Sequence, residues 1–243
     1  MKLSFSKYQG AGNDFIMLDN FDGSYDNLSI SDIQQACDRK FGIGADGLIL
    51  LRKHATSDFE VVYYNADGSQ SFCGNGARCA VAFARAINQL PAPHTTFMAI
   101  DGAHEAWLCQ DEVKLKMSDV GTINKMDHAF ELHTGSPHYV MMDENHSAAH
   151  VDQVGKSIRY NDTYKATGIN VNLLKYTDNG IQVATYERGV EAETLSCGTG
   201  VTAAALVYAQ LQQIKQGQHM GFIARVFASN INTCKCVHFE IRF

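Results

Sequence analysis

The sequence predicts a mixed α+β fold made of two similar halves, each with one long helix wrapped by strands. The phrase Cys-Gly-x-Gly occurs twice, and its two cysteines, Cys73 and Cys197, lie 124 residues apart. The same spacing matches Phe15–Asp19 to Tyr139–Asp143. Matches that repeat in one register indicate an internal duplication. A chain of 243 residues also has the length of two domains of about 120 residues each.

The duplication predicts a domain boundary near the middle of the chain. We expect an N-terminal lobe at residues 1–121 that carries Cys73, and a C-terminal lobe at residues 122–243 that carries Cys197. The active site is expected in the cleft between these lobes, because a ligand there would meet one thiol from each half.

The first half is expected to alternate strands and helices. Apolar residues in partial alternation predict strands at residues 3–8, 15–19, 48–52 and 59–64. Helical spacing predicts one helix at 31–41, capped by Ser29 or Ser31, and another at 74–90 that ends before Pro91. Strands at 105–109 and 112–117 are expected to form a hairpin that turns at Gln110 and Asp111.

The second half is expected to repeat this order. Strands are predicted at residues 139–143, 169–176 and 181–186, and helices at 151–159 and 198–214. The turn Asp178-Asn179-Gly180 is typical of a tight hairpin. Residues 221–243 have only a weak β-like pattern.

The composition excludes several classes of protein. Hydrophobic residues make up 45% of the chain and charged residues 19%, which predicts an ordered core. The net charge of −6 argues against nucleic acid as a partner, because nucleic acid binding needs a basic face. The sequence has no signal-peptide pattern and no apolar run of membrane-spanning length. It therefore predicts a soluble, cytoplasmic protein that does not bind a membrane.

The cysteines are not arranged for disulfides or for a metal. Their number, seven, is odd, and no Cys-x-x-Cys or His-Glu-x-x-His spacing occurs. We expect Cys37, Cys79 and Cys109 to be small buried hydrophobic residues. Cys73 and Cys197 need a different explanation, because each is predicted to lie immediately before a helix.

A cysteine at the start of a helix suits acid–base chemistry. The helix N-terminus favours the thiolate, and its first backbone N–H groups can bind a carboxylate. With an amino-acid α-carbon between two such thiols, one thiolate removes the α-proton and the other thiol protonates the opposite face. This chemistry needs no metal and no organic cofactor. The alternative is that each Cys-Gly-x-Gly is only a turn that enters a helix, but retention of both cysteines after duplication favours the two-base racemase or epimerase.

The chain resembles a known family, the cofactor-independent diaminopimelate epimerases. The matching phrases, in chain order, are Gly12-Asn13-Asp14-Phe15, Gly42-Ile43-Gly44-Ala45-Asp46-Gly47, Asn65-Ala66-Asp67-Gly68-Ser69, Cys73-Gly74-Asn75-Gly76-Ala77-Arg78-Cys79, Tyr186-Glu187-Arg188-Gly189 and Cys197-Gly198-Thr199-Gly200. The resemblance implies interconversion of LL- and meso-diaminopimelate, on the route to lysine and peptidoglycan. It also implies two pseudo-symmetric lobes, each a central helix in a β-barrel-like mixed sheet, and allows pairing as a homodimer.

The resemblance also implies roles for particular residues. The implied catalytic residues are Cys73, Cys197, His138 and Glu187, with His138 able to tune a thiol or pass protons. The implied substrate-binding residues are Asn13, Asn65, Gly74, Asn75, Asn170, Glu187, Arg188, Gly198 and Thr199. Glu187 would bind the distal ammonium of the substrate, and Arg188 would form a bidentate pair with its distal carboxylate.

Several features depart from the family pattern, and two of them matter most here. Ser136 stands where the family usually has an asparagine that binds substrate, and residues after about 217 lack the family's usual closing strands. Two alternatives therefore stay open: another two-cysteine racemase of the proline or hydroxyproline type, and a non-catalytic ligand-binding or thiol-redox protein. The first would not need the distal clamp of Glu187 and Arg188, and the second would not exchange a substrate α-hydrogen with solvent.

Overall fold

A computed structural model of the chain describes residues 3–90, 92–109, 112–117, 119–178, 180–195 and 197–212, and the backbone of 219–224 and 237–242. The chain divides into two compact units, Met1–Lys116 and Met117–Phe243. The boundary predicted after residue 121 lies a few residues further along. No helix in the described ranges is long and apolar enough to cross a membrane.

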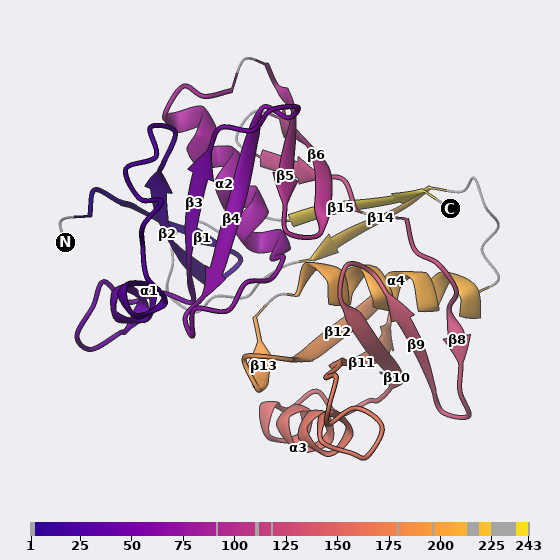
Figure 1. Ribbon diagram of the computed structural model, residues 1–243. Helices are drawn as coiled ribbons and strands as arrows, with labels where there is room; N and C mark the ends of the chain where they lie inside the picture. The colour runs from indigo at the N-terminus through magenta and orange to yellow at the C-terminus, as the bar shows by residue number, and fades with distance from the viewer. Residues whose placement is uncertain are drawn as a thin grey trace. The chain divides into compact units, whose positions relative to one another are not determined.

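The N-terminal unit is built on a seven-stranded sheet in which strands adjacent in sequence are adjacent in space. Its strands are β1 (Ser6–Gly10), β2 (Asn13–Asp19), β3 (Gly47–Arg52), β4 (Phe59–Asn65), β5 (His94–Ala99), β6 (Gly102–Cys109) and β7 (Glu112–Leu115) (Figure 1). The β2–β3 and β4–β5 pairs are parallel. Since parallel neighbours need a crossover, helices α1 (Ile30–Cys37) and α2 (Gly74–Ala86) make these two connections.

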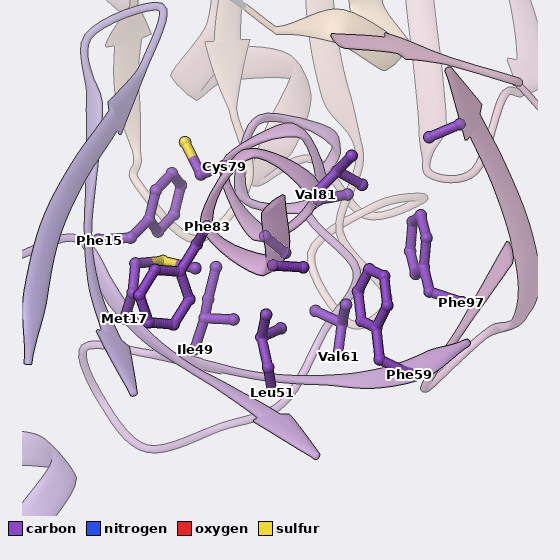
Figure 2. Packing of buried hydrophobic residues seen from close by; sticks show 14 residues of the cluster. Phe15, Met17, Ile49, Leu51, Phe59, Val61, Cys79, Val81, Phe83 and Phe97 are labelled. Carbon is purple, nitrogen blue, oxygen red and sulfur yellow. The ribbon is translucent and has the colours of Figure 1, made fainter. Parts of the chain in front are cut away.

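The core of this unit lies between the sheet and α2. Figure 2 shows α2 enclosed by the curving strands, with Phe59 and Phe97 beneath one side of the helix and Phe15 and Met17 beneath the other. The alternate residues of β2 point to the opposite face, where Ile16 and Leu18 pack against α1. The expected central helix within a curved mixed sheet is therefore confirmed.

The C-terminal unit has a six-stranded sheet, ordered β13-β12-β11-β10-β9-β8. Its strands are β8 (Asn124–Lys125), β9 (Ala129–His133), β10 (Pro137–Met142), β11 (Asn170–Thr177), β12 (Gly180–Glu187) and β13 (Ala192–Thr194). Helix α3 (Ala148–Arg159) covers one face of this sheet, and α4 (Gly198–Leu211) covers the other. A separate antiparallel pair joins β14 (His219–Ala224) to β15 (Val237–Arg242).

The side-chain faces show how the two units correspond. Phe15 packs against α2, so its counterpart must pack against α4. On β10, His138 and Val140 lie on the α4 face, whereas Tyr139 packs on the α3 face. Strands β2 and β3 therefore repeat as β10 and β11 with a spacing of 123 residues, which pairs Phe15 with His138, while the central helices α2 and α4 keep the predicted 124. The predicted match of Phe15 with Tyr139 is wrong by one residue, a shift that exchanges the two faces of a strand.

Three predicted helices end earlier than expected, and one of them is α4, which was predicted to reach residue 214 and ends at Leu211. Helix α1 stops at Cys37, because the following chain turns back and the N–H groups of Ile43 and Gly44 both donate to the carbonyl of Ala36. Helix α2 stops at Ala86, because Asn88 has a left-handed backbone with φ of 58°. The predicted helix start at Ser29 is confirmed by a capping box with Asp32.

Candidate active site: two cysteine half-sites

Cys73 is the N-cap residue of α2, at the predicted position. Its Sγ accepts a hydrogen bond from the backbone N–H of Gly76 at 3.5 Å. The same sulfur lies 3.8 Å from Oδ1 of Asn13, which begins β2. The N-terminal unit thus places Cys73 and Asn13, two of the predicted site residues, side by side.

The amide of Asn13 is oriented by a carboxylate. Its Nδ2 donates to Oδ2 of Asp46 at 2.6 Å, which leaves Oδ1 facing Cys73 and the Nδ2 of Asn75, 3.4 Å away. Asp46 is in turn held by Arg39 at 2.7 Å. A carboxylate and guanidinium behind the amide therefore fix which of its atoms meets the thiol.

Arg78 is a site residue that the motif analysis did not single out. It lies one turn into α2 and donates through a guanidinium nitrogen to Oδ1 of Asn75. Burial lowers the pKa of Arg78, and the nearby Cys73 and Cys79 thiols act in the opposite direction. Since an arginine in a protein keeps its proton, its positive charge favours the thiolate form of Cys73.

Asn65 lies at the end of β4 and closes a turn. Its Nδ2 donates to the hydroxyls of Ser69 and Ser71 at 3.0 and 3.2 Å, and its backbone N–H donates to the carbonyl of Ser69. Its role in substrate binding stays a prediction.

Cys197 is the N-cap residue of α4, which confirms the predicted helix start. Its Sγ lies 3.4 Å from the hydroxyl of Thr199, and that hydroxyl lies 2.9 Å from Nε2 of His138. Nδ1 of His138 lies 2.9 Å from Nδ2 of Asn172. The C-terminal unit thus connects Cys197, Thr199 and His138, as the predicted site requires, and adds Asn172.

A second group of predicted residues surrounds Asn170. Its Nδ2 donates to the hydroxyl of Ser136 at 2.7 Å and to the carbonyl of Pro137 at 3.2 Å, and its Oδ1 accepts from the backbone N–H of Arg188 at 2.8 Å. Ser136 thus takes a hydrogen bond from Asn170, and Asn170 fixes the backbone from which the Arg188 side chain extends. Glu187, the preceding residue, is partly buried at the end of β12.

The side chain of Arg188 lines an open pocket of about 490 Å³. Glu131 and Tyr164 also line it, joined by a 2.7 Å hydrogen bond from the tyrosine hydroxyl to the carboxylate. The guanidinium donates to the carbonyl of Thr167 at 3.1 Å and is otherwise exposed. A methyl group at Gly168 would collide with the Arg188 stem, so the glycine makes room for this side chain.

We call the groups of residues around Cys73 and around Cys197 the two half-sites. The other cysteines within the described ranges belong to neither of them. Burial raises the pKa of Cys37 to about 11 and that of Cys79 to about 12, which confirms both as buried, unreactive thiols. Cys109 is only partly buried, so the prediction was wrong there. Within the described ranges, no three His, Cys, Asp or Glu side chains gather in a way that would hold a metal ion.

His138 predicts a pH dependence of stability. It is fully buried, and burial lowers its pKa from 6.5 to about 3. The unfolded chain therefore binds a proton at this residue near pH 5 while the folded chain does not. We expect the free energy of unfolding to fall as pH drops below about 6.5, by up to about 1.4 kcal/mol per pH unit from this residue.

Denaturant unfolding of wild type and His138→Gln between pH 4.5 and 7.5 measures this effect. The variant should show a shallower dependence on pH, whereas His128→Gln, which changes an exposed histidine, should not. Equal slopes for wild type and His138→Gln would contradict the prediction.

The fold is shared with structures of several racemase-like and isomerase-like proteins. A phenazine biosynthesis protein of the PhzF family from Bacillus anthracis has a TM-score of 0.69 at 12% identity, over 93% of this chain and 86% of its own. A probable proline racemase from Agrobacterium radiobacter has a TM-score of 0.61 at 13% identity, over 91% and 80%. The chain thus has the α+β fold of this class of proteins.

Sequence comparison is more specific. The model of the diaminopimelate epimerase family matches residues 5–121 and 130–222. A diaminopimelate epimerase of Flavobacterium psychrophilum is 50% identical over 203 residues, which cover 82% of this chain and 79% of that protein. One of Chlorobaculum tepidum is 42% identical over 214 residues, 84% and 83% of the two chains. The chain belongs to the diaminopimelate epimerase family.

Proposed function

We propose that the protein interconverts LL- and meso-diaminopimelate by proton transfer at the α-carbon, with one cysteine as base and the other as acid. The observation that carries this proposal is a cysteine N-cap on the equivalent helix of each unit, α2 and α4, in a member of this family. Two acid–base groups of one kind suit a reaction whose substrate and product differ only at one α-carbon.

The proposed reaction needs only the two thiols as proton acceptor and proton donor. One thiolate takes the α-proton, and the electrons of the C–H bond pass to the α-carbon and its carboxylate. The opposite thiol then gives its proton to the other face, so the two cysteines exchange protonation states. The first N–H groups of α2 and α4, at Gly74 and Asn75 and at Gly198 and Thr199, are suited to stabilise the anionic carboxylate.

The residues around each thiol support this assignment. Arg78 provides positive charge near Cys73. The Thr199 hydroxyl lies 3.4 Å from Sγ of Cys197. Asn13, Asn65, Asn75 and Asn170 are proposed to bind the polar groups of the zwitterionic substrate. Glu187 is proposed to bind the distal ammonium.

The test of the reaction is the fate of LL-diaminopimelate in D2O, with reduced protein and no added cofactor. We expect meso product that carries deuterium at the inverted α-carbon. A protein that only binds a ligand, or only cycles its thiols, would leave the α-hydrogen in place. That result, with both thiols shown to be reduced, would overturn the proposal.

The distal clamp distinguishes this reaction from other two-thiol racemisations. We expect Arg188→Leu to raise the KM for diaminopimelate by about 100-fold, because loss of a bidentate ion pair costs about 3 kcal/mol. Proline has no distal carboxylate, so a proline racemase would not need this contact.

Steady-state kinetics of wild type, Arg188→Leu and Arg188→Lys measure the effect. Lysine keeps the charge but not the paired donors, so its KM should fall between the other two. Unchanged turnover of diaminopimelate by Arg188→Leu would count against the assigned substrate.

A further inference from the structure

We propose that Asn172 and the hydroxyl of Thr199 are positioning residues for Cys197, which act through His138 to present a hydrogen-bond donor to the cysteine thiolate. The proposal rests on the proposed function, in which Cys197 is one of the two acid–base groups. It assigns a role to Asn172 and to the Thr199 side chain, neither of which touches the reacting carbon in this scheme.

The chain of hydrogen bonds begins at Asn172, whose amide has one possible orientation. Nδ2 lies 3.2 Å from the backbone carbonyl of Tyr139, which can only accept, and Oδ1 lies 2.9 Å from the hydroxyl of Thr185. The amide therefore cannot be flipped, because its oxygen would then face the Tyr139 carbonyl oxygen. The second hydrogen of Nδ2 points to Nδ1 of His138, 2.9 Å away. Asn172 is fully buried, so water does not compete for these contacts.

The Asn172 donor fixes the tautomer of His138. Nδ1 must accept, so a neutral imidazole carries its hydrogen on Nε2. Burial lowers the pKa of His138 and keeps the ring neutral at neutral pH, and the nearby His133 and Arg188 act in the same direction. The Nε2–H then donates to the hydroxyl oxygen of Thr199 at 2.9 Å.

The Thr199 hydroxyl connects His138 to the Cys197 thiol. Its oxygen accepts from His138, so its own hydrogen is left to donate, and Cys197 Sγ lies 3.4 Å away. A hydrogen bond to the charged form of a group favours that form. The chain from Asn172 to Thr199 thus ends in a donor aimed at the Cys197 thiolate.

The other half of the molecule shows that folding does not require this polar chain. With the strand spacing of 123 residues, Phe15 is the counterpart of His138, and Ile49 is the counterpart of Asn172. Both are fully buried core residues that pack beneath α2. The C-terminal unit buries an imidazole and an amide at places where apolar side chains complete the same kind of core, which points to a role in the chemistry.

The first test measures the Cys197 thiolate without any turnover. In a Cys73→Ala background, the ultraviolet thiolate absorbance is titrated with pH, and the signal of Cys73→Ala/Cys197→Ala is subtracted to isolate Cys197. We expect Thr199→Val, which replaces a hydroxyl by a methyl of equal size, to move the Cys197 midpoint upward by about one pH unit. Thr199→Ser, which keeps the hydroxyl, should stay within a few tenths of a unit of the parent.

Thr202→Val is the matched control. Thr202 is buried on the same helix, and its hydroxyl donates to the carbonyl of Gly198 at 2.9 Å rather than to the thiol. An unchanged midpoint in Thr199→Val, or an equal shift in Thr202→Val, would overturn the proposal. Because the absorbance needs no substrate, either result is distinguishable from failure of the proposed epimerase activity.

The second test addresses Asn172 directly. Nitrogen chemical shifts of the imidazole rings, assigned with His138→Gln, report which nitrogen carries the hydrogen. We expect His138 to be neutral with its hydrogen on Nε2 at neutral pH, and Asn172→Leu to lose this fixed tautomer and to raise the Cys197 midpoint as Thr199→Val does. A hydrogen on Nδ1 in the wild type would reverse the chain and refute the role of Asn172.

Discussion

Replacement of either Cys73 or Cys197 by alanine is expected to reduce epimerisation by about 1,000-fold or more, because each variant lacks one of the two acid–base groups. Both cysteines are N-cap residues, Cys73 partly buried and Cys197 buried. Replacement by alanine removes only the sulfur atom, so the fold should survive. Epimerisation of LL-diaminopimelate followed by circular dichroism or chiral chromatography measures the loss.

The two single variants should also differ from each other in D2O. A remaining thiolate can remove the α-proton only from the stereoisomer whose hydrogen faces it, and it can return a proton only to that same face. We therefore expect each variant to exchange the α-hydrogen of one stereoisomer at most, without inversion. The two variants should have opposite preferences.

Cys109→Ala is the control for this prediction. Cys109 is a partly buried thiol at the end of β6 and belongs to neither half-site. Its replacement should leave epimerisation unchanged. Near-wild-type turnover by Cys73→Ala or by Cys197→Ala would show that the two-base mechanism is wrong.

The starts of the two central helices were predictable because their signals are local. A cysteine, two glycines and an apolar helical face mark each start, and α2 and α4 begin at Gly74 and Gly198 as predicted. The end of α1 was not predictable in this way. It depends on hydrogen bonds from Ile43 and Gly44 back to Ala36, and these come from how the next loop folds.

The candidate site was predictable where a motif carried it and not elsewhere. Cys197 and Thr199 belong to one phrase, and the structure joins them. Asn172 lies within an apolar strand and has no motif of its own, so periodicity alone placed it as an ordinary strand residue. The available signal was its spacing of two from Asn170, since alternate strand residues share a face. That face is the one covered by α4.

The second glycine of each phrase serves helix packing rather than approach to a ligand. A methyl group at Gly200 would collide with Oδ1 of Asn172 and lie 3.0 Å from Oγ1 of Thr185. At the equivalent Gly76 its closest contact would be the end of the Ile49 side chain, at 3.0 Å, and its other neighbours would lie at 3.5 Å. The neighbour of Gly76 can move, because the terminal methyl of Ile49 can rotate away. The neighbour of Gly200 cannot, because hydrogen bonds hold the Asn172 amide in place.

Gly200→Ala is accordingly expected to destabilise the protein by about 1–3 kcal/mol, and Gly76→Ala by less, since overpacking costs most where neighbours cannot move. Gly121→Ala is the control, because its methyl group would have nothing within 4 Å. Denaturant unfolding measures all three. Gly200→Ala must also displace Asn172, so it should raise the Cys197 midpoint as Thr199→Val does. A Gly200→Ala protein as stable as Gly121→Ala would mean that α4 does not pack against Asn172 as closely as the structure has it.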